Sequence, residues 1–174
     1  MRRSTVTSLA LACVVAGAAV LAARSDAGGG PARPPVPTPG VGKVDAPLLA
    51  AMVGSWDVTS TGPAGPSRAR ATFRAAAGGT ALLHEYESST QTAFAGVGVL
   101  RVSPDGRTVT AWWFDSYAPE PQKLSGPLTK DRAELYGSSN GGPLTIVWER
   151  VADGLDFTLR NGETTVLSER YRRP

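Results

Sequence analysis

The side chains best suited to chemistry surround the single histidine, His84. Alternate side chains of a strand face opposite sides, so His84 and Tyr86 would share one face while Glu85 and Glu87 share the other. Facing the interior, His84 and Tyr86 could bind haem iron or move a proton, whereas facing outward they would be a solvated pair. The sequence leaves that choice open. Because one histidine does not make a metal site, we predict no bound metal and no cofactor.

Acid–base catalysis would need a carboxyl group that is desolvated and has a raised pKa. Glu85, Glu87 and Asp115 are candidates, but alternating glutamates on a strand usually form a wet face. The segment Gly137–Gly141 matches Gly-x-Ser-x-Gly, yet a strand-like segment follows it and no histidine occurs after His84. We therefore predict no catalytic residue. A small barrel enzyme that uses His84 or an acidic residue stays as an alternative.

The most aromatic segment is Thr110–Tyr117, in which the consecutive Trp112 and Trp113 must face opposite sides of a strand. Trp113 continues the face of Val109 and Ala111. Four tryptophans suit a cavity that stacks on a flat or greasy ligand. A small barrel also fills its interior with large side chains, so both explanations stand at this point.

Two glycines, Gly96 and Gly98, share a strand face with Phe94 and Leu100. Their missing side chains would leave room either for a ligand or for a neighbouring indole. If a small molecule binds inside, we expect an apolar wall with a few polar groups. The residues predicted to line this site are Trp113, Trp148, Phe94, Phe157, Tyr86 and His84.

These residues fall on short alternating segments that turns separate. In 67–76, for example, four polar positions alternate with alanines and a phenylalanine. Asn161-Gly162 predicts a hairpin in which both central residues have positive φ. The connections are too short for helical crossovers, which predicts antiparallel neighbours. We expect about ten strands, near 54–60, 67–76, 80–88, 93–102, 107–116, 122–128, 132–137, 143–151, 154–160 and 164–172.

One short helix is expected before the strands. Asp45 can cap it, Pro47 suits its first turn and Gly54 can end it, with an apolar side formed by Leu48, Leu49 and Met52. So many short strands favour one closed barrel, since closure removes exposed edges. The predicted fold class is all-β: a single antiparallel up-and-down barrel whose N-terminal helix plugs one end.

Gly54-Ser55-Trp56 after a short helix resembles the Gly-x-Trp opening of the lipocalin and calycin barrels. Together with Ala77–Leu82 and Trp113–Ser116, it resembles the bacterial family catalogued as domain of unknown function 1579, over roughly residues 47–172. That resemblance implies a lipocalin-like barrel and no agreed activity. It also implies that Trp56 packs at the closed end beneath an arginine from the last strand, Arg170 or Arg172.

The chain before the barrel predicts an address outside the cytoplasm. Residues 1–27 carry Arg2, Arg3 and an apolar run from Leu9 to Ala23, typical of an export signal. That run is shorter than the ~20 residues of a membrane span, although a retained anchor is the alternative. Residues 28–44 are rich in proline and glycine and predict a disordered linker. The barrel domain is then 45–174.

Charge excludes one class of partner. Of 18 basic and 15 acidic residues, five basic and one acidic precede Asp45, so the barrel domain is close to neutral. Binding to a phosphate backbone, and hence to nucleic acid, is not expected. The only cysteine, Cys13, lies in the predicted signal, so disulfides and thiolate chemistry are not expected either.

The leading hypothesis is an exported barrel that holds a small apolar or aromatic ligand in its lumen, touching a membrane only through an uncleaved N-terminal segment. A second hypothesis is an envelope interaction module with a packed, ligand-free barrel. It would present Trp112 and the row of Arg68, Arg70 and Arg74 to a partner, because tryptophan and arginine are favoured interface anchors. The sequence predicts no oligomeric state.

Overall fold

The computed structural model describes residues 46–174 except 64, 90–93 and 140–141. The predicted signal (1–27) and the predicted linker (28–44) lie outside the described residues. Within the part that is described, no helix combines the length and apolar character needed to cross a membrane.

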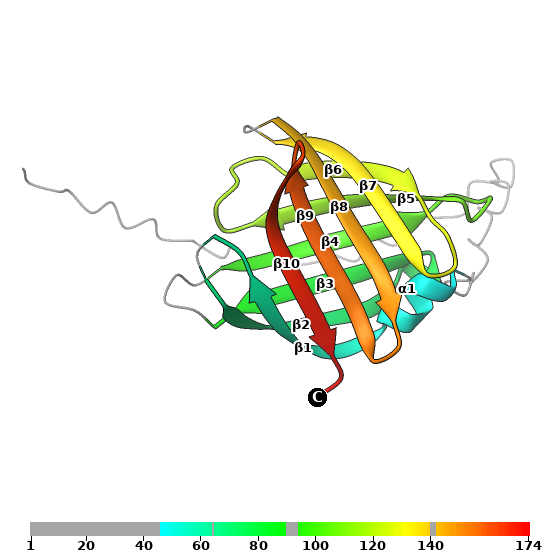
Figure 1. Ribbon diagram of the computed structural model, residues 1–174. Coiled ribbons are helices and arrows are strands. Elements are labelled where there is room, and N and C mark those ends of the chain that lie inside the picture. The colour runs from blue at the N-terminus through cyan, green and yellow to red at the C-terminus, as the bar shows by residue number, and fades with distance from the viewer. Residues whose placement is uncertain (1–45, 64, 90–93, 140–141) are drawn as a thin grey trace, which may run out of the picture. The chain divides into compact units, whose positions relative to one another are not determined.

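Ten antiparallel strands form one closed barrel (Figure 1). Each strand pairs with its neighbours in sequence, and the last strand pairs with the first, which confirms the predicted all-β, ten-strand antiparallel barrel. The strands are β1 (Gly54–Thr61), β2 (Ser67–Ala76), β3 (Ala81–Ser88), β4 (Ala95–Val102), β5 (Thr108–Asp115), β6 (Gln122–Pro127), β7 (Arg132–Ser139), β8 (Gly142–Val151), β9 (Gly154–Asn161) and β10 (Thr164–Arg172).

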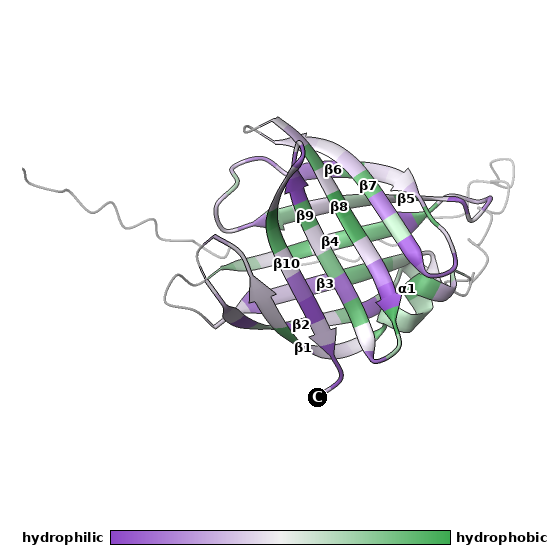
Figure 2. Cartoon of the chain, viewed as in Figure 1, coloured by the Kyte–Doolittle hydropathy of each residue, from purple (hydrophilic) through white to green (hydrophobic). Residues whose placement is uncertain are grey.

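Alternation sets the two faces of the wall. Along β2, Ala69, Ala71 and Phe73 are buried while Arg68 and Arg70 are exposed, as the pattern predicts. Figure 2 shows the same banding of hydrophobic and hydrophilic residues along β8, β9 and β10. Every strand therefore has one face for the interior and one for solvent.

The turn between β9 and β10 differs from the prediction. Asn161 pairs with Thr164, so the two loop residues are Gly162 and Glu163. Only Gly162 has a positive φ there (58°), and Asn161 ends β9 in an ordinary strand conformation. The loop therefore begins one residue later than predicted, because Asn161 is paired with Thr164 and belongs to β9.

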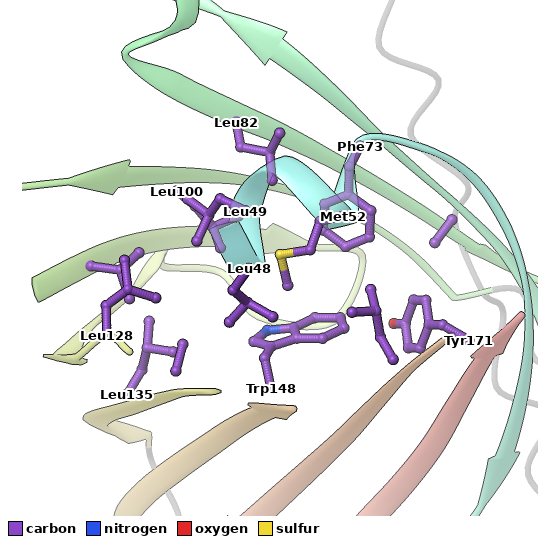
Figure 3. Packing of buried hydrophobic residues seen from close by; sticks show 14 of the residues in the cluster. Leu48, Leu49, Met52, Phe73, Leu82, Leu100, Leu128, Leu135, Trp148 and Tyr171 are labelled. Carbon is purple, nitrogen blue, oxygen red and sulfur yellow. The ribbon is translucent and has the colours of Figure 1, made fainter. Parts of the chain in front are cut away.

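A two-turn helix, α1 (Pro47–Met52), packs at one end of the barrel. Its N-cap residue is Ala46, which makes no side-chain cap, in place of the Asp45 that we expected. A single turn of 3₁₀ helix, η1 (Ala77–Gly79), joins β2 to β3. Figure 3 shows the apolar side of α1 directed at the core; the side chains labelled there are Leu48, Leu49, Met52, Phe73, Leu82, Leu100, Leu128, Leu135, Trp148 and Tyr171.

Trp56 links this helix to the barrel. Its indole is 4% exposed, and Nε1–H donates to the carbonyl of Met52 at 2.7 Å. The guanidinium of Arg173 lies 3.7 Å from the centre of the Trp56 ring system. The same group donates to the carbonyls of Ala51 and Val53, both at 2.9 Å. One arginine thus covers the tryptophan and satisfies carbonyls at the helix C-terminus.

The arginine over the tryptophan is therefore Arg173, and our expectation of Arg170 or Arg172 was wrong. The register pairs Asp57 with Arg172, so Arg172 shares the outer face with Asp57. Both Arg170 and Arg172 form ion pairs with Asp153, at 3.7 and 2.6 Å. Residue 173 lies one place beyond the strand and has the same parity as the inward-facing Tyr171, so its side chain can reach Trp56 at the closed end.

We predict that Arg173→Ala lowers the free energy of unfolding by about 1–2 kcal/mol, because it removes a cation–π contact and charged hydrogen bonds. Arg172→Ala is the matched control and should cost well under 1 kcal/mol, since it breaks a surface ion pair with Asp153 and one long hydrogen bond to the Tyr171 carbonyl. Urea unfolding followed by tryptophan fluorescence measures both. Equal losses in the two variants would contradict the role of Arg173.

Candidate functional site

The lumen of the barrel is hollow beyond the core. A cavity of about 530 Å³ lies between the inward faces of the strands. That volume is within the range of small-molecule sites, roughly 300–1,000 Å³. All six residues predicted to line a ligand site lie on its wall: Trp113, Trp148, Phe94, Phe157, Tyr86 and His84.

The cavity wall changes character along the barrel axis. Near α1 it is bounded by buried aromatic and aliphatic side chains such as Trp148, Leu100 and Leu135. At the strand ends away from α1 the wall also carries polar side chains, which lie among apolar ones such as Phe94 and Val166; the polar residues are Ser67, Ser88, Asp115, Gln122, Ser139 and Asn161. The site therefore has an apolar floor and a mixed rim that holds most of its polar side chains.

The two inward glycines make room for an indole. A Cβ on Gly96 would collide with the Trp113 ring, and a Cβ on Gly98 would lie 2.9 Å from its Cε3. The ring is held in that position because its Nε1–H donates to Asp115 Oδ2 at 3.0 Å. Of the two explanations for these glycines, the structure selects the neighbouring indole, and the indole itself forms part of the cavity wall.

His84 faces the interior, which settles the orientation that alternation left open. It is 6% exposed and stacks on Phe73, with ring centres 4.1 Å apart and planes 9° apart. Trp113 and Trp148 lie beside it, at 5.2 and 5.8 Å between ring centres. Its Nε2 is buried and has no hydrogen-bond partner among the described residues.

Burial lowers the pKa of His84 from 6.5 to about 3, because water is excluded from the charged form. The imidazole is therefore neutral at ordinary pH and a poor proton acceptor. It can still offer a ring nitrogen to a polar group inside the cavity.

A buried carboxylate that sequence reasoning missed lies in the same wall. Glu169 is 6% exposed and accepts three hydroxyl hydrogen bonds. The Ser60 and Tyr86 hydroxyls donate to Oε1 at 2.7 and 2.6 Å, and the Tyr171 hydroxyl donates to Oε2 at 2.8 Å. We call these four residues the Glu169 cluster. The sequence offered one signal for this site: Glu169 is two positions from Tyr171, so both side chains face the same side of β10.

Both tyrosines of this cluster are held in the protonated form. Burial, and then the negative charge of Glu169, raise the pKa of Tyr86 and of Tyr171 above the ordinary value. Each phenol is therefore a permanent hydrogen-bond donor to the carboxylate across the ordinary pH range.

Of the candidate acids, Glu85 and Glu87 lie outside the cavity, and Asp115 lies on its rim. Glu85 and Glu87 are exposed, and Glu85 pairs with Arg74 at 2.8 Å. Asp115 accepts from the backbone amides of Tyr117 and Ala118, both at 2.8 Å, so it organises the turn after β5. Among the described residues, no three His, Cys, Asp or Glu side chains gather as a metal site would require.

The elements of the interaction hypothesis are separated on the surface. Trp112 faces outward, with the Lys123 ammonium 5.9 Å from the centre of its ring system. The arginine row of Arg68, Arg70 and Arg74 is on β2, and strands β3 and β4 lie between β2 and β5. Trp112 and the arginines therefore do not form one compact patch.

Comparison with known proteins adds only a fold likeness. No family model matches the sequence, and no curated protein matches it, so the resemblance to domain of unknown function 1579 stays a prediction. Among solved structures, the chain is similar to a redesigned β-barrel at 12% identity and a TM-score of 0.44. The match covers 75% of this chain and 97% of the designed one.

The buried histidine predicts a pH dependence of stability. Its pKa is about 3 when folded and 6.5 when exposed, so below pH 6.5 the unfolded chain gains a proton that the folded one excludes. The stabilisation is complete above pH 6.5 and declines as the pH falls toward 3. Between about pH 7.5 and pH 5.5 we expect a loss of about 1 kcal/mol.

His84→Leu, which cannot titrate, should lack this particular loss over the same pH interval. Urea unfolding at several pH values compares the two slopes. Identical slopes in the wild-type protein and the variant would show that His84 takes up its proton in the folded state.

Proposed function

We propose that this protein is an exported, lipocalin-like barrel that binds one small, mostly apolar aromatic molecule in its lumen. The hollow interior carries the proposal: ten strands enclose about 530 Å³ that their side chains do not fill. A packed barrel whose only role is structural has no need of such a void, because unfilled core volume is destabilising.

The chemistry of the wall supports an aromatic ligand. Trp148 and Phe157 are in contact, with ring centres 4.7 Å apart, and Phe94 and Trp113 are near parallel at 6.5 Å. Such rings offer flat faces and edges against which an aromatic ligand stacks.

Two further parts of the proposal rest on sequence. The sequence of residues 1–27 supports export, and an exported protein would have its site outside the cytoplasm. The Gly-x-Trp opening, together with Trp56 beneath an arginine at the closed end, supports the lipocalin-like subtype and the relation to domain of unknown function 1579.

The neutral fluorescent amine N-phenyl-1-naphthylamine tests the proposal, since its emission rises in an apolar site. We expect saturable binding of one dye per chain to the purified protein, with quenching of tryptophan emission. Ala111→Phe, which fills the lumen, should weaken binding by about tenfold or more, a cost of about 1.4 kcal/mol.

Val97→Phe is the matched control, because Val97 lies on the outer face of the neighbouring strand and is 38% exposed. It should leave the dye affinity unchanged. An absence of saturable binding, or equal losses in the two variants, would reject luminal binding. The outer-face interaction hypothesis would then take its place.

A further inference from the structure

The cavity wall is electrostatically one-sided. Its ionisable side chains are Asp115 and Glu169, the neutral His84, and two tyrosines that stay protonated. Among the described residues that line it, none is lysine or arginine. The basic residues that form ion pairs, such as Arg74, Arg132 and Arg170, do so with acids elsewhere on the barrel. The lumen therefore has negative charge without a cation of its own.

Glu169 is the more buried of the two acids that line the cavity. Three hydroxyl groups hydrogen-bond to it, but hydroxyls carry no net positive charge. A carboxylate has about four acceptor positions, so room for another donor remains, on Oε2. Burying a charge without an opposite charge is costly, and the charge of this carboxylate would be best compensated by a cation in the cavity.

The surroundings of Glu169 suit an organic cation. Tyr171, which donates to Glu169, lies 5.0 Å from Trp148 between ring centres, and Tyr86 lies 5.8 Å from Phe94. Aromatic faces attract ammonium groups through the ring quadrupole, most strongly where water is excluded. The unpartnered Nε2 of His84, in a side chain more than nine-tenths buried in the same wall, offers a second polar contact.

Building on the proposed function, we propose that the luminal ligand is an aromatic molecule carrying an aliphatic ammonium group. The ammonium binds the Glu169 carboxylate, the ring lies among the aromatic side chains of the wall, and His84 Nε2 hydrogen-bonds a further polar group of the ligand. The same wall disfavours fatty acids and other carboxylates, because it has no arginine or lysine to receive them.

A series of three probes of nearly equal size tests the charge preference. They are 2-(1-naphthyl)ethylamine, which is cationic at neutral pH, the neutral 2-(1-naphthyl)ethanol, and the anionic 1-naphthylacetate. Each competes with bound N-phenyl-1-naphthylamine. We expect the amine to bind about tenfold more tightly than the alcohol, and the carboxylate to bind most weakly.

Glu169→Gln removes the charge while keeping the size of the side chain and its ability to hydrogen-bond. In this variant the amine should fall to the affinity of the alcohol, while the alcohol and the dye change by no more than about twofold. Glu85→Gln removes an exposed acid on the outer face of β3 and should leave the affinities of all three probes unchanged. If Glu169→Gln does not fold, the probe order in the wild-type protein decides alone.

The outcomes separate the two proposals. Binding of the dye with equal affinities for amine and alcohol would overturn the ammonium preference and leave luminal binding standing. An equal loss of amine and alcohol in Glu169→Gln would do the same, because it would show a structural role for the carboxylate. Failure of the dye and of every probe to bind would overturn both.

Discussion

The pairing of β10 with β1 is the constraint on which the rest of the structure depends. It turns an open ten-strand meander into a closed wall and leaves no sheet edge unpaired. The same register places Glu169 directly opposite Ser60, so closure also assembles the hydrogen bonds around the buried carboxylate. Just beyond the last pair, Arg173 reaches over Trp56 and ties the helix to the barrel.

Ten strands enclose more space than the inward side chains fill, and the filling is uneven. At the α1 end, Leu48, Leu49 and Met52 add apolar volume from the helix to that from the strands. Toward the other end none of the described helices contributes, and the interior holds the cavity. The helix therefore adds apolar packing at one end of a barrel whose interior is otherwise partly unfilled.

The polar side chains inside the lumen differ in whether the protein itself supplies their hydrogen-bond or charge partners. Trp113 is paired with Asp115, and Tyr86 and Tyr171 are paired with Glu169, so their positions are set by the protein itself. Among the described residues, the Nε2 atom of His84 has no hydrogen-bond partner, and no lysine or arginine lines the cavity beside Glu169. Under the proposed function, these two polar groups would orient a ligand in an otherwise aromatic cavity.

Alternation was sufficient to predict the strand count, the antiparallel order and the faces of β2 and β5, because side-chain period and turn residues are local properties. It also separated Trp112 from Trp113. The register pairs Trp112 with the exposed Lys123 on the outer face, and the Trp113 ring lies against Gly96 and Gly98 on the inner face. The six residues chosen for the lumen all lie on the cavity. Five are aromatic, four of them on strands and Phe94 just before β4, and the sixth, His84, is two positions from Tyr86 and so shares its face.

The remaining features depended on which strands meet. Both faces of β3 mix polar and apolar residues, so only packing against Phe73 turned His84 inward. The arginine over Trp56 was decided by the β1–β10 register, which alternation within one strand does not contain. Glu169 reads in sequence as one more wet acid on a strand. Tertiary structure alone made it a buried site, because its hydrogen-bond donors come from β1, β3 and β10 and meet only when the barrel closes.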